Sequence, residues 1–360
     1  IVSKIEELFS DLDAAVVALE RAKANLKRYR ASVLKAAVEG KLTEAWRAAH
    51  PSTEPASKLL ERILIERRQK WEADQLAKFA ASGKQPPKNW KDKYVEPTPP
   101  DTTNLPQLPE GWKYGSLEQL TSAARPICYG ILMPKENVPE GVLYVKVKDM
   151  KGDRIDLAGL QRTTEAIANE FSRASLKAGD WLLSIRGTYG RVAEVPIELD
   201  GGNITQDTAR LDITVKISKV FVASAMRGTL CQNYFKQVAR GVAVKGVNIA
   251  DVRLCPIPIC SFAEQLEVAN LVCEKFSQIE IAEKEIHHSL VRASRLRQSI
   301  LKRAFEGKLV PQDPSDEPAS ELLERLRTSR PSIEENSKPS TRVQTRGRNA
   351  KSKQNHVSNE

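Results

Sequence analysis

The sequence of 360 residues lacks any long apolar run. Its charge-free stretch Leu254–Ala263 is only ten residues long and contains two prolines, whereas a membrane helix needs about 18 consecutive apolar residues. The start of the chain has neither an initiator methionine nor the basic and apolar segments of a secretory signal. We therefore expect no membrane span, and we expect Ile1 to be an internal position of a longer protein.

Cysteine and histidine are scarce. Five cysteines are an odd number in so long a chain, which argues against a secreted disulfide framework and makes the reducing cytoplasm the expected location. Cys255, Cys260, Cys273 and His287 could be combined into one site, but their spacing fits no common zinc pattern. We therefore expect this chain to bind no metal.

Motifs for several classes of enzyme are also missing. The sequence contains no G-x-x-x-x-G-K-[ST] phosphate loop, no G-x-G-x-x-G dinucleotide motif and no G-x-S-x-G nucleophile elbow. Pro139-Glu140 followed by Asp149-Met150-Lys151 loosely resembles a Mg²⁺-dependent nuclease site. A turn followed by a strand with charged outward positions explains these residues better, so we expect no catalytic residue in this chain.

Positive charge exceeds negative charge. The chain has 56 lysines and arginines against 46 aspartates and glutamates, a formal net charge of +10, which suits a polyanionic partner. Residues 327–360 contain eight basic and three acidic residues and so carry half of that net charge. The composition favours a nucleic-acid partner without establishing it, because the rest of the chain is only mildly basic.

An internal repeat organises the chain. The segment Ser32–Leu42 (SVLKAAVEGKL) matches Ser299–Leu309 (SILKRAFEGKL), and Glu54–Ile63 (EPASKLLERI) matches Glu317–Leu326 (EPASELLERL). The repeats of a solenoid must touch their neighbours, and these two copies are too far apart in the sequence to do so. They bracket a separate domain instead.

Each copy begins with a long helix whose apolar residues recur every three and four positions, a period typical of coiled coils. In the first copy the pattern predicts a helix over residues 2–38, with Gly40 at its C-terminal cap. We expect the two helices to pair in antiparallel orientation; an ordinary amphipathic helix packed on a globular domain is the alternative. The predicted seam between them contains Ile5, Leu12, Leu19, Leu26, Val33, Ile279, Ile286, Leu296 and Ile300.

The composition changes between the two copies. Seven of the 20 prolines fall within residues 82–110, a density that predicts an extended linker. Beyond it, short apolar runs predict strands at Leu143–Met150, Asp180–Ile185, Arg191–Ile197 and Ala209–Val215, and Val220–Ala239 has the period of a helix. The predicted fold class is α+β, with two long antiparallel coiled-coil-like helices flanking one compact mixed α/β domain.

The predicted organisation has five parts. They are a helical region 1–81 with a long helix 2–38 and a second helix 57–81, a proline-rich linker 82–107, a compact domain 108–262, a second helical region 263–326 that repeats 1–63, and a disordered basic tail 327–360.

Three short segments of the sequence, together with the repeat and the linker, resemble those of a known protein family. LPEGW (Leu108–Trp112) opens the compact domain, and LKAGDWLLSIRGTYGRVAEV (Leu176–Val195) combines a Gly-Asp strand with a glycine turn. PIPICSFAEQLEV (Pro256–Val268) leads to a Glu-Gln pair that opens the second long helix. The family is the specificity (S) subunits of type I restriction–modification systems. Its members normally carry two recognition domains, so residues 1–326 resemble the C-terminal half with the central conserved helix.

The resemblance implies a non-catalytic subunit whose target-recognition domain reads one half of a bipartite double-stranded DNA target. Methyltransferase (M) subunits would dock on the helices and bind S-adenosylmethionine, and a restriction (R) subunit would supply ATP- and Mg²⁺-dependent translocation and cleavage. A second recognition domain, from the missing half or from another copy, would read the rest of the target. A helix-mediated scaffold whose recognition domain no longer reads DNA is the alternative hypothesis.

The residues that contact DNA are predicted from their chemistry. Arginine and lysine suit guanine or phosphate, and asparagine and glutamine suit adenine. The candidates are polar residues beside the expected turns, namely Lys146, Lys148, Arg186, Thr188, Tyr189, Arg191, Gln206, Lys245 and Asn248. For each of them a solvated surface side chain is the alternative.

Overall fold

The computed structural model describes residues 1–311 and 313–329 of the chain. It confirms the predicted α+β class and contains two compact units, residues 8–298 and residues 1–7 together with 299–329. The helices are α1 (Val2–Val38), α2 (Glu44–Ala49), α3 (Ala56–Ala81), α4 (Glu165–Glu170), α5 (Lys219–Arg227), α6 (Thr229–Val238), α7 (Ile249–Arg253), α8 (Phe262–Phe305) and α9 (Ala319–Thr328). Short 3₁₀ helices are η1 (Trp90–Lys93), η2 (Val147–Asp149), η3 (Ser172–Ala174) and η4 (Ile197–Leu199).

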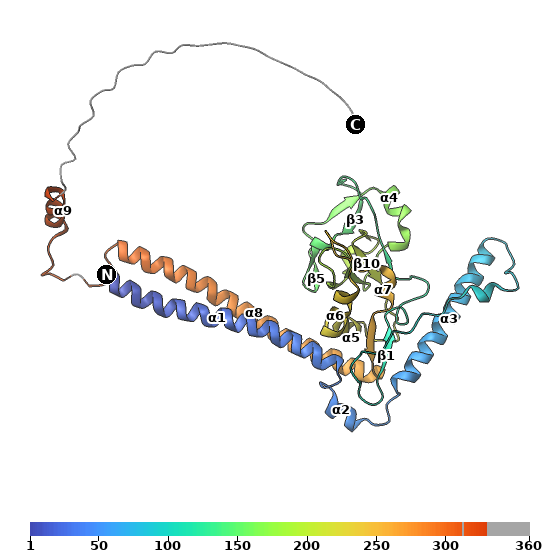
Figure 1. Cartoon of the computed structure of the whole chain (residues 1–360). Coiled ribbons are helices and arrows are strands. Elements are labelled where there is room, and N and C mark those ends of the chain that lie inside the picture. The colour runs from blue at the N-terminus through green and yellow to red at the C-terminus, as the bar shows by residue number, and fades with distance from the viewer. Residues whose placement is uncertain (312, 330–360) are drawn as a thin grey trace, which may run out of the picture. The chain divides into compact units, whose positions relative to one another are not determined.

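Within the larger unit, α1 and α8 lie side by side and run in opposite directions (Figure 1). Asp13 of α1 pairs with Arg297 of α8 at 3.2 Å, and Arg30 of α1 pairs with Glu283 of α8 at 3.3 Å. As the residue number increases along α1, the number of the contacting residue in α8 therefore decreases. The predicted antiparallel orientation is confirmed for residues 8–38 and 262–298.

The sides of α1 and α8 that face each other carry most of the predicted seam. Its buried or half-buried members in this unit are Leu12, Leu19, Leu26, Val33, Ile279 and Ile286. Leu296 differs, because its side chain is 50% exposed. The neighbouring Arg297 is also exposed, with 48% of its side chain accessible, and its guanidinium sits 4.6 Å from the centroid of the Phe9 ring. An arginine can cover an aromatic ring at the edge of a helix interface while its charged group stays in water.

The smaller unit contains the first residues of α1, the end of α8 and helix α9. Ile5 is half-buried and Ile300 is buried, as seam positions should be. The predicted tail 327–360 lies outside the described residues from position 330 onward. Its first two residues, 327 and 328, form the end of α9 rather than a disordered segment.

Both copies of the repeat end their long helix in the same way. Gly40 has φ +70° and Gly307 has φ +69°, left-handed values that favour glycine. The next residue donates its N–H to a carbonyl five positions back in each copy, Lys41 to Ala36 at 2.9 Å and Lys308 to Arg303 at 2.8 Å. This is the Schellman pattern of helix termination, so the predicted cap at Gly40 is confirmed.

The predicted linker folds back in its first half. Trp90 of η1 is buried and stacks on Trp71 of α3, with ring centroids 6.0 Å apart, and it meets the ring of Phe79 edge-on at 6.4 Å. Helix α3 ends at Ala81, before the first proline, where Gly83 has φ +66° and the N–H of Lys84 donates to Phe79 O at 3.0 Å. The prolines that follow do not keep the segment extended. The apolar surface of one tryptophan is enough to fold it against α3.

The compact domain begins and ends in neighbouring strands. Strand β1 (Lys113–Ser116) pairs antiparallel with β11 (Pro256–Ile259), with Lys113 opposite Ile259. Between them, four strands form a sheet in the order β2 (Cys128–Tyr129), β10 (Thr208–Leu211), β7 (Trp181–Ser184) and β8 (Val192–Glu194). A second sheet has the order β6 (Gln161–Thr163), β3 (Val142–Val145) and β9 (Asn203–Ile204), and β4 (Met150–Lys151) pairs with β5 (Arg154–Ile155).

Two elements predicted as continuous are interrupted. The predicted strand Leu143–Met150 breaks at η2, where the buried Asp149 carboxylate accepts the N–H of Lys146 at 2.9 Å. The predicted helix Val220–Ala239 divides into α5 and α6 at Gly228, whose backbone is extended with ψ 159°. Gly228 is a weak helix former, and hydrophobic periodicity alone does not register such a break.

One hydrophobic core joins the helical region to the compact domain. Val33, Ala37 and Leu59 from α1 and α3 belong to the same buried cluster as Phe221 and Ile257 of the domain. The domain therefore packs against the end of α1 and the start of α8. Among the described residues, none of the helices combines the length and apolar character that crossing a bilayer requires.

Candidate nucleic-acid interface

A pocket of about 550 Å³ lies on the compact domain where three loops meet. Arg186, Gln206 and Asn248, three of the residues predicted to contact DNA, line it together with Arg240 and Tyr129. They come from the loop after β7, the turn between β9 and β10, the residue before α7, the loop after α6, and strand β2. The fold thus gathers polar side chains that lie far apart in the sequence. We call this the domain pocket.

Main-chain hydrogen bonds build the walls of the domain pocket. The N–H of Val247 donates to Ile185 O at 2.7 Å, and the N–H of Gly187 donates to Lys245 O at 3.0 Å. Arg240 and Gly246 exchange two bonds of 2.8 Å across the loop that joins α6 to α7. Because the backbone makes these contacts, the side chains at the rim remain available for a ligand.

The chemistry of that rim suits DNA. Asn248 is the N-cap residue of α7, yet its side chain makes no capping hydrogen bond. The Arg186 guanidinium is more than half exposed, and its Nε lies 3.9 Å from an Asp207 carboxylate oxygen, too far for a hydrogen bond. A guanidinium and an amide with unsaturated hydrogen-bonding capacity are the groups that read guanine and adenine edges.

The loop between Arg240 and Gly246 has a fixed shape and an exposed tip. Gly241 has φ +120°, and a Cβ there would come within 2.3 Å of Val244 O, so only glycine fits the turn. Val242 and Val244 are exposed at the tip. The loop therefore presents apolar side chains beside the basic rim of the pocket.

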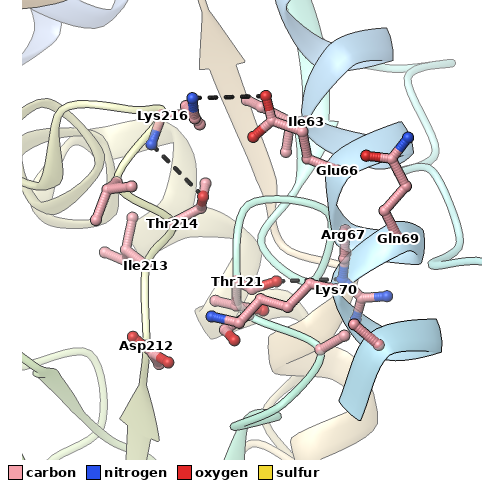
Figure 2. A pocket seen from close by; sticks show the side chains of 14 residues that line it. Ile63, Glu66, Arg67, Gln69, Lys70, Thr121, Asp212, Ile213, Thr214 and Lys216 are labelled. Atoms are coloured by element: carbon pink, nitrogen blue, oxygen red, sulfur yellow. Dashed lines mark hydrogen bonds and ion pairs between the residues drawn. The ribbon is translucent and has the colours of Figure 1, made fainter. Parts of the chain in front are cut away.

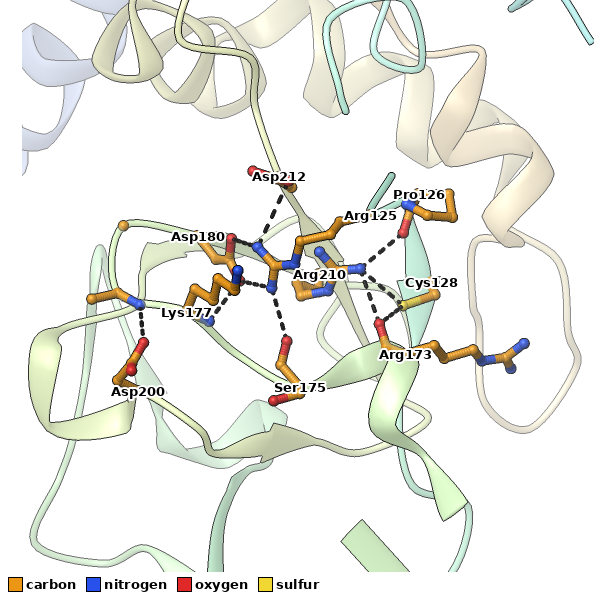
Figure 3. Close-up of polar contacts among 12 residues, drawn as sticks. Arg125, Pro126, Cys128, Arg173, Ser175, Lys177, Asp180, Asp200, Arg210 and Asp212 are labelled. Carbon is orange, nitrogen blue, oxygen red and sulfur yellow. Dashed lines mark hydrogen bonds and ion pairs between the residues drawn. The ribbon is translucent and has the colours of Figure 1, made fainter. Parts of the chain in front are cut away.

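A cation–π pair extends the domain pocket. The Arg173 guanidinium lies 5.3 Å from the centroid of the Tyr129 ring. Behind this pair, the side chain of Arg210 is only 1% exposed, and its Nη2 donates to Arg173 O at 3.0 Å and to Pro126 O at 3.1 Å (Figure 3). Arg210 thereby ties together the two segments that carry Tyr129 and Arg173.

A second, partly buried arginine supports the same region. Arg125 makes a bidentate pair with Asp180, with both N–O distances 2.7 Å, and it also donates to Ser175 O at 2.9 Å (Figure 3). Asp180 in turn accepts the N–H of Lys177 at 2.8 Å. The Gly-Asp phrase noted in the sequence is thus a structural anchor that holds the start of β7.

Two predicted DNA contacts are engaged inside the protein. Nη1 of Arg191 donates to Met150 O at 2.8 Å and to Val147 O at 3.2 Å. Nζ of Lys146 donates to Gln161 and lies 5.2 Å from the centroid of the Tyr144 ring. These two side chains hold the turn around η2, so their charges are less available to a ligand than those of Arg186 and Arg240.

The remaining predicted residues are divided between surface and core. Thr188, Lys148 and Lys245 are exposed, whereas Tyr189 packs against the main hydrophobic cluster. Arg240 and Tyr129 line the pocket but were not predicted from the sequence, and neither was Arg173, which contacts the Tyr129 ring. Arg240 begins the segment RGVAVKGVN, in which Lys245 and Asn248 were predicted to contact DNA. The same loop could therefore have indicated Arg240.

The nuclease-like residues do not form a site. The Asp149 carboxylate accepts the N–H of Lys146 and so has a structural role, but it is buried, whereas the sequence predicted an outward-facing charge on a strand. Among residues 1–311 and 313–329, no three histidine, cysteine or acidic side chains lie close enough together to hold a metal ion.

Comparison with known proteins identifies relatives of the chain. No family model matches it. It is 26% identical over 339 residues to the type I restriction enzyme EcoBI specificity subunit of Escherichia coli, which covers 92% of this chain and 62% of that protein. It is 23% identical over 353 residues to the EcoKI specificity subunit of E. coli strain K12, covering 92% and 61%.

The chain also has a short segment of high sequence identity to another relative and a structural similarity to a solved protein. The chain is 71% identical over 31 residues to the EcoAI specificity subunit of E. coli, covering 9% of the chain and 5% of that protein. The crystal structure of the HsdS subunit from Thermoanaerobacter tengcongensis aligns with 71% of this chain and 57% of its own, at 17% identity and a TM-score of 0.41.

The chain spans about three fifths of the length of the curated relatives EcoBI and EcoKI. The alignments to them cover 92% of the chain. Over most of its length the chain is therefore similar to type I restriction enzyme specificity subunits.

Proposed function

We propose that this chain reads one half of a bipartite DNA target as the non-catalytic specificity module of a type I restriction–modification complex in the cytoplasm. The observation that carries the proposal is the domain pocket, where Arg186, Gln206, Asn248 and Arg240 converge. Arginine offers a bidentate match to guanine, and the two amides offer one to adenine. The apolar tip at Val242 and Val244 suits contact with thymine methyl groups or base faces.

The helix pair α1–α8 has a different part in this proposal. It holds the compact domain at one end through a shared core, and its outer faces are the docking surface for M subunits. Those subunits bind S-adenosylmethionine, and an R subunit supplies ATP- and Mg²⁺-dependent cleavage. The other half of the target is read by a second recognition domain, which the longer relatives have room to contain.

The test replaces pocket residues and reads the target. Arg186→Ala with Asn248→Ala, in a host that supplies the M subunits, is expected to lose or relax one half of the methylated sequence. Each lost bidentate base contact costs about 1–3 kcal/mol of discrimination. Methylome sequencing gives the half-site directly.

Matched controls come from the same domain. Lys177 and Asn169 are exposed residues outside the pocket, so Lys177→Ala with Asn169→Ala removes the same charge and the same amide. This control should leave the target unchanged. A pocket variant with the wild-type methylome would contradict the proposal and favour a scaffold whose compact domain no longer reads DNA.

A further inference from the structure

A helical arm projects from the larger unit beyond the contact between α3 and the compact domain (Figure 1). It consists of the second half of α3, the turn after it and η1, residues 64–97. Its far end, residues 78–93, contains five lysines and a single acidic residue, Asp92. We call these residues the lysine tip. This positive charge lies outside the domain pocket, so DNA binding by the pocket does not account for it.

Most lysines of the tip are exposed and form no ion pair within the described residues. Lys78, Lys84, Lys88 and Lys93 are exposed, and within the described part of the chain none of them pairs with a carboxylate. Lys91 alone has a partner, Glu72 at 2.9 Å. The hydrogen bond from Lys91 lowers the pKa of the Glu72 carboxyl, so this pair stays charged at neutral pH and ties η1 to α3.

Aromatic side chains make the arm a built element rather than a loose hairpin. Trp71, Phe79, Trp90 and Tyr94 contact one another between α3 and η1. Nη1 of Arg67 donates to the hydroxyl oxygen of Tyr94 at 3.1 Å. The aromatic side chains of the arm therefore pack within the arm, whereas Leu76 and Val95 are exposed along with the lysines.

The base of the arm is fixed to the compact domain. Nε of Arg67 donates to Thr121 O at 3.2 Å, and Lys216 pairs with Glu66 at 3.5 Å (Figure 2). These two contacts lie in a groove of about 490 Å³ between α3 and the segment 212–216 (Figure 2). The lysine tip is thus carried at a set position relative to the domain that holds the pocket.

We propose that the lysine tip binds the phosphate backbone of duplex DNA as a second contact, separate from the domain pocket and independent of base sequence. The inference deepens the proposed function and rests on it for the identity of the partner. Lysines are point charges that suit phosphate. A protein-docking surface would instead expose aromatic side chains and be depleted in lysine, and this arm has the opposite arrangement.

The test is a salt titration with the full chain. Lys78, Lys84, Lys88 and Lys93 are all changed to Gln, and binding to a labelled duplex of random sequence is followed by fluorescence anisotropy. Each phosphate contact contributes a slope of about 0.9 in log K against log salt, so the slope should fall by up to about 3.6. Affinity for a target duplex and for the random duplex should fall by the same factor.

The control removes equal charge elsewhere. Lys27, Lys177, Lys236 and Lys284 are exposed lysines outside the arm and the domain pocket, and changing all four to Gln should leave the slope nearly unchanged. An equal loss of slope in this control would overturn the proposal, because net charge alone would then explain the effect. If the fourfold arm variant fails to fold, single Lys84→Gln and Lys88→Gln variants should each lower the slope by about 0.9.

Two other outcomes separate the hypotheses. A folded arm variant with the wild-type slope, with or without loss of M-subunit binding, would overturn the phosphate contact. Failure of the proposed function has a different signature: the pocket variant Arg186→Ala with Asn248→Ala would keep the wild-type methylome, while the slope on random duplex still reports on the arm.

Discussion

The carboxylate of Glu264 lies 2.6 Å from Nη1 of Arg47, and this ion pair joins the start of α8 to the segment that follows α1. Glu264 is only 2% exposed, and it also accepts hydrogen bonds from the Thr43 hydroxyl at 2.7 Å and from the Trp112 indole at 3.1 Å. One buried carboxylate therefore connects α8, the α1–α2 turn and the segment that leads into β1.

The neighbouring residue completes the junction. Oε1 of Gln265 accepts the N–H of Ser218 at 2.9 Å, and its Nε2 donates to Cys260 O at 2.8 Å. In the Glu-Gln pair, Glu264 thus connects the helical region to Trp112 at the start of the compact domain, and Gln265 binds the compact domain alone.

Loss of the Glu264 charge should destabilise the larger unit. Breaking a buried ion pair by removing one partner costs about 3–5 kcal/mol, because the other charge is left uncompensated; Arg47 is partly exposed, so we expect the lower end for Glu264→Gln. The free energy of unfolding from a urea titration measures it. Glu285→Gln, at an exposed position of α8, should stay within about 0.5 kcal/mol of the wild type, and an equal loss there would remove the special role of Glu264.

The stability of the helix pair should depend on the packing of its apolar seam. Leu19 is half-buried on the seam, between the Asp13–Arg297 and Arg30–Glu283 contacts. Leu19→Asp puts a charge against apolar neighbours and should cost about 1–3 kcal/mol. Val17→Asp is the matched change at a position that is 59% exposed, and it should leave the melting temperature nearly unchanged. Equal melting temperatures for the two variants would mean that the pair has no packed seam.

The order of helices and domain along the chain was predictable because short sequence patterns indicate each element. Apolar spacing predicted α1, and a glycine after the last turn predicted the cap at Gly40. The repeat indicated that two such helices bracket a domain. The sequence pattern did not predict two features: Leu296 is exposed although it follows the apolar spacing, and Trp90 folds the proline-rich segment back onto α3.

The candidate site was predictable only in part for a related reason. Residue chemistry selected Arg186, Gln206 and Asn248, which the fold brings into one pocket. The same chemistry selected Arg191, whose guanidinium is engaged by backbone carbonyls. Sequence alone does not show whether an arginine points to solvent or to the carbonyls of a turn packed against it.

The cysteines should differ in reactivity. Cys273 is exposed on α8, whereas the other four are buried, and burial raises the pKa values of the Cys255 and Cys260 thiols. Since the thiolate is the nucleophile, iodoacetamide at pH 8 should modify only Cys273 in the native chain. Mass spectrometry of tryptic peptides gives the site, and Cys273→Ser should abolish the labelling. Modification of Cys255 in the folded protein would contradict the packing of β11.

The length of α1–α8 should set the gap between the two halves of the DNA target. The cap at Gly40 is closely packed, since a Cβ there would lie 2.8 Å from Pro109 Cγ, so lengthening is better made inside the helices. Seven residues inserted between Leu19 and Glu20, with seven more between Ser289 and Leu290, keep the seam in register because they add one heptad to each helix.

The two inserts extend the pair by about 10 Å at ~1.5 Å per residue, which corresponds to about three base pairs at ~3.4 Å each. The half-site sequences should not change, because the helices do not touch base edges in this proposal. Methylome sequencing with M subunits and the second recognition domain supplied gives the gap directly. The same insert in α1 alone should abolish methylation, because it leaves the two helices unequal and displaces every later seam contact. Altered half-sites with an unaltered gap would show that the helix pair is not the spacer.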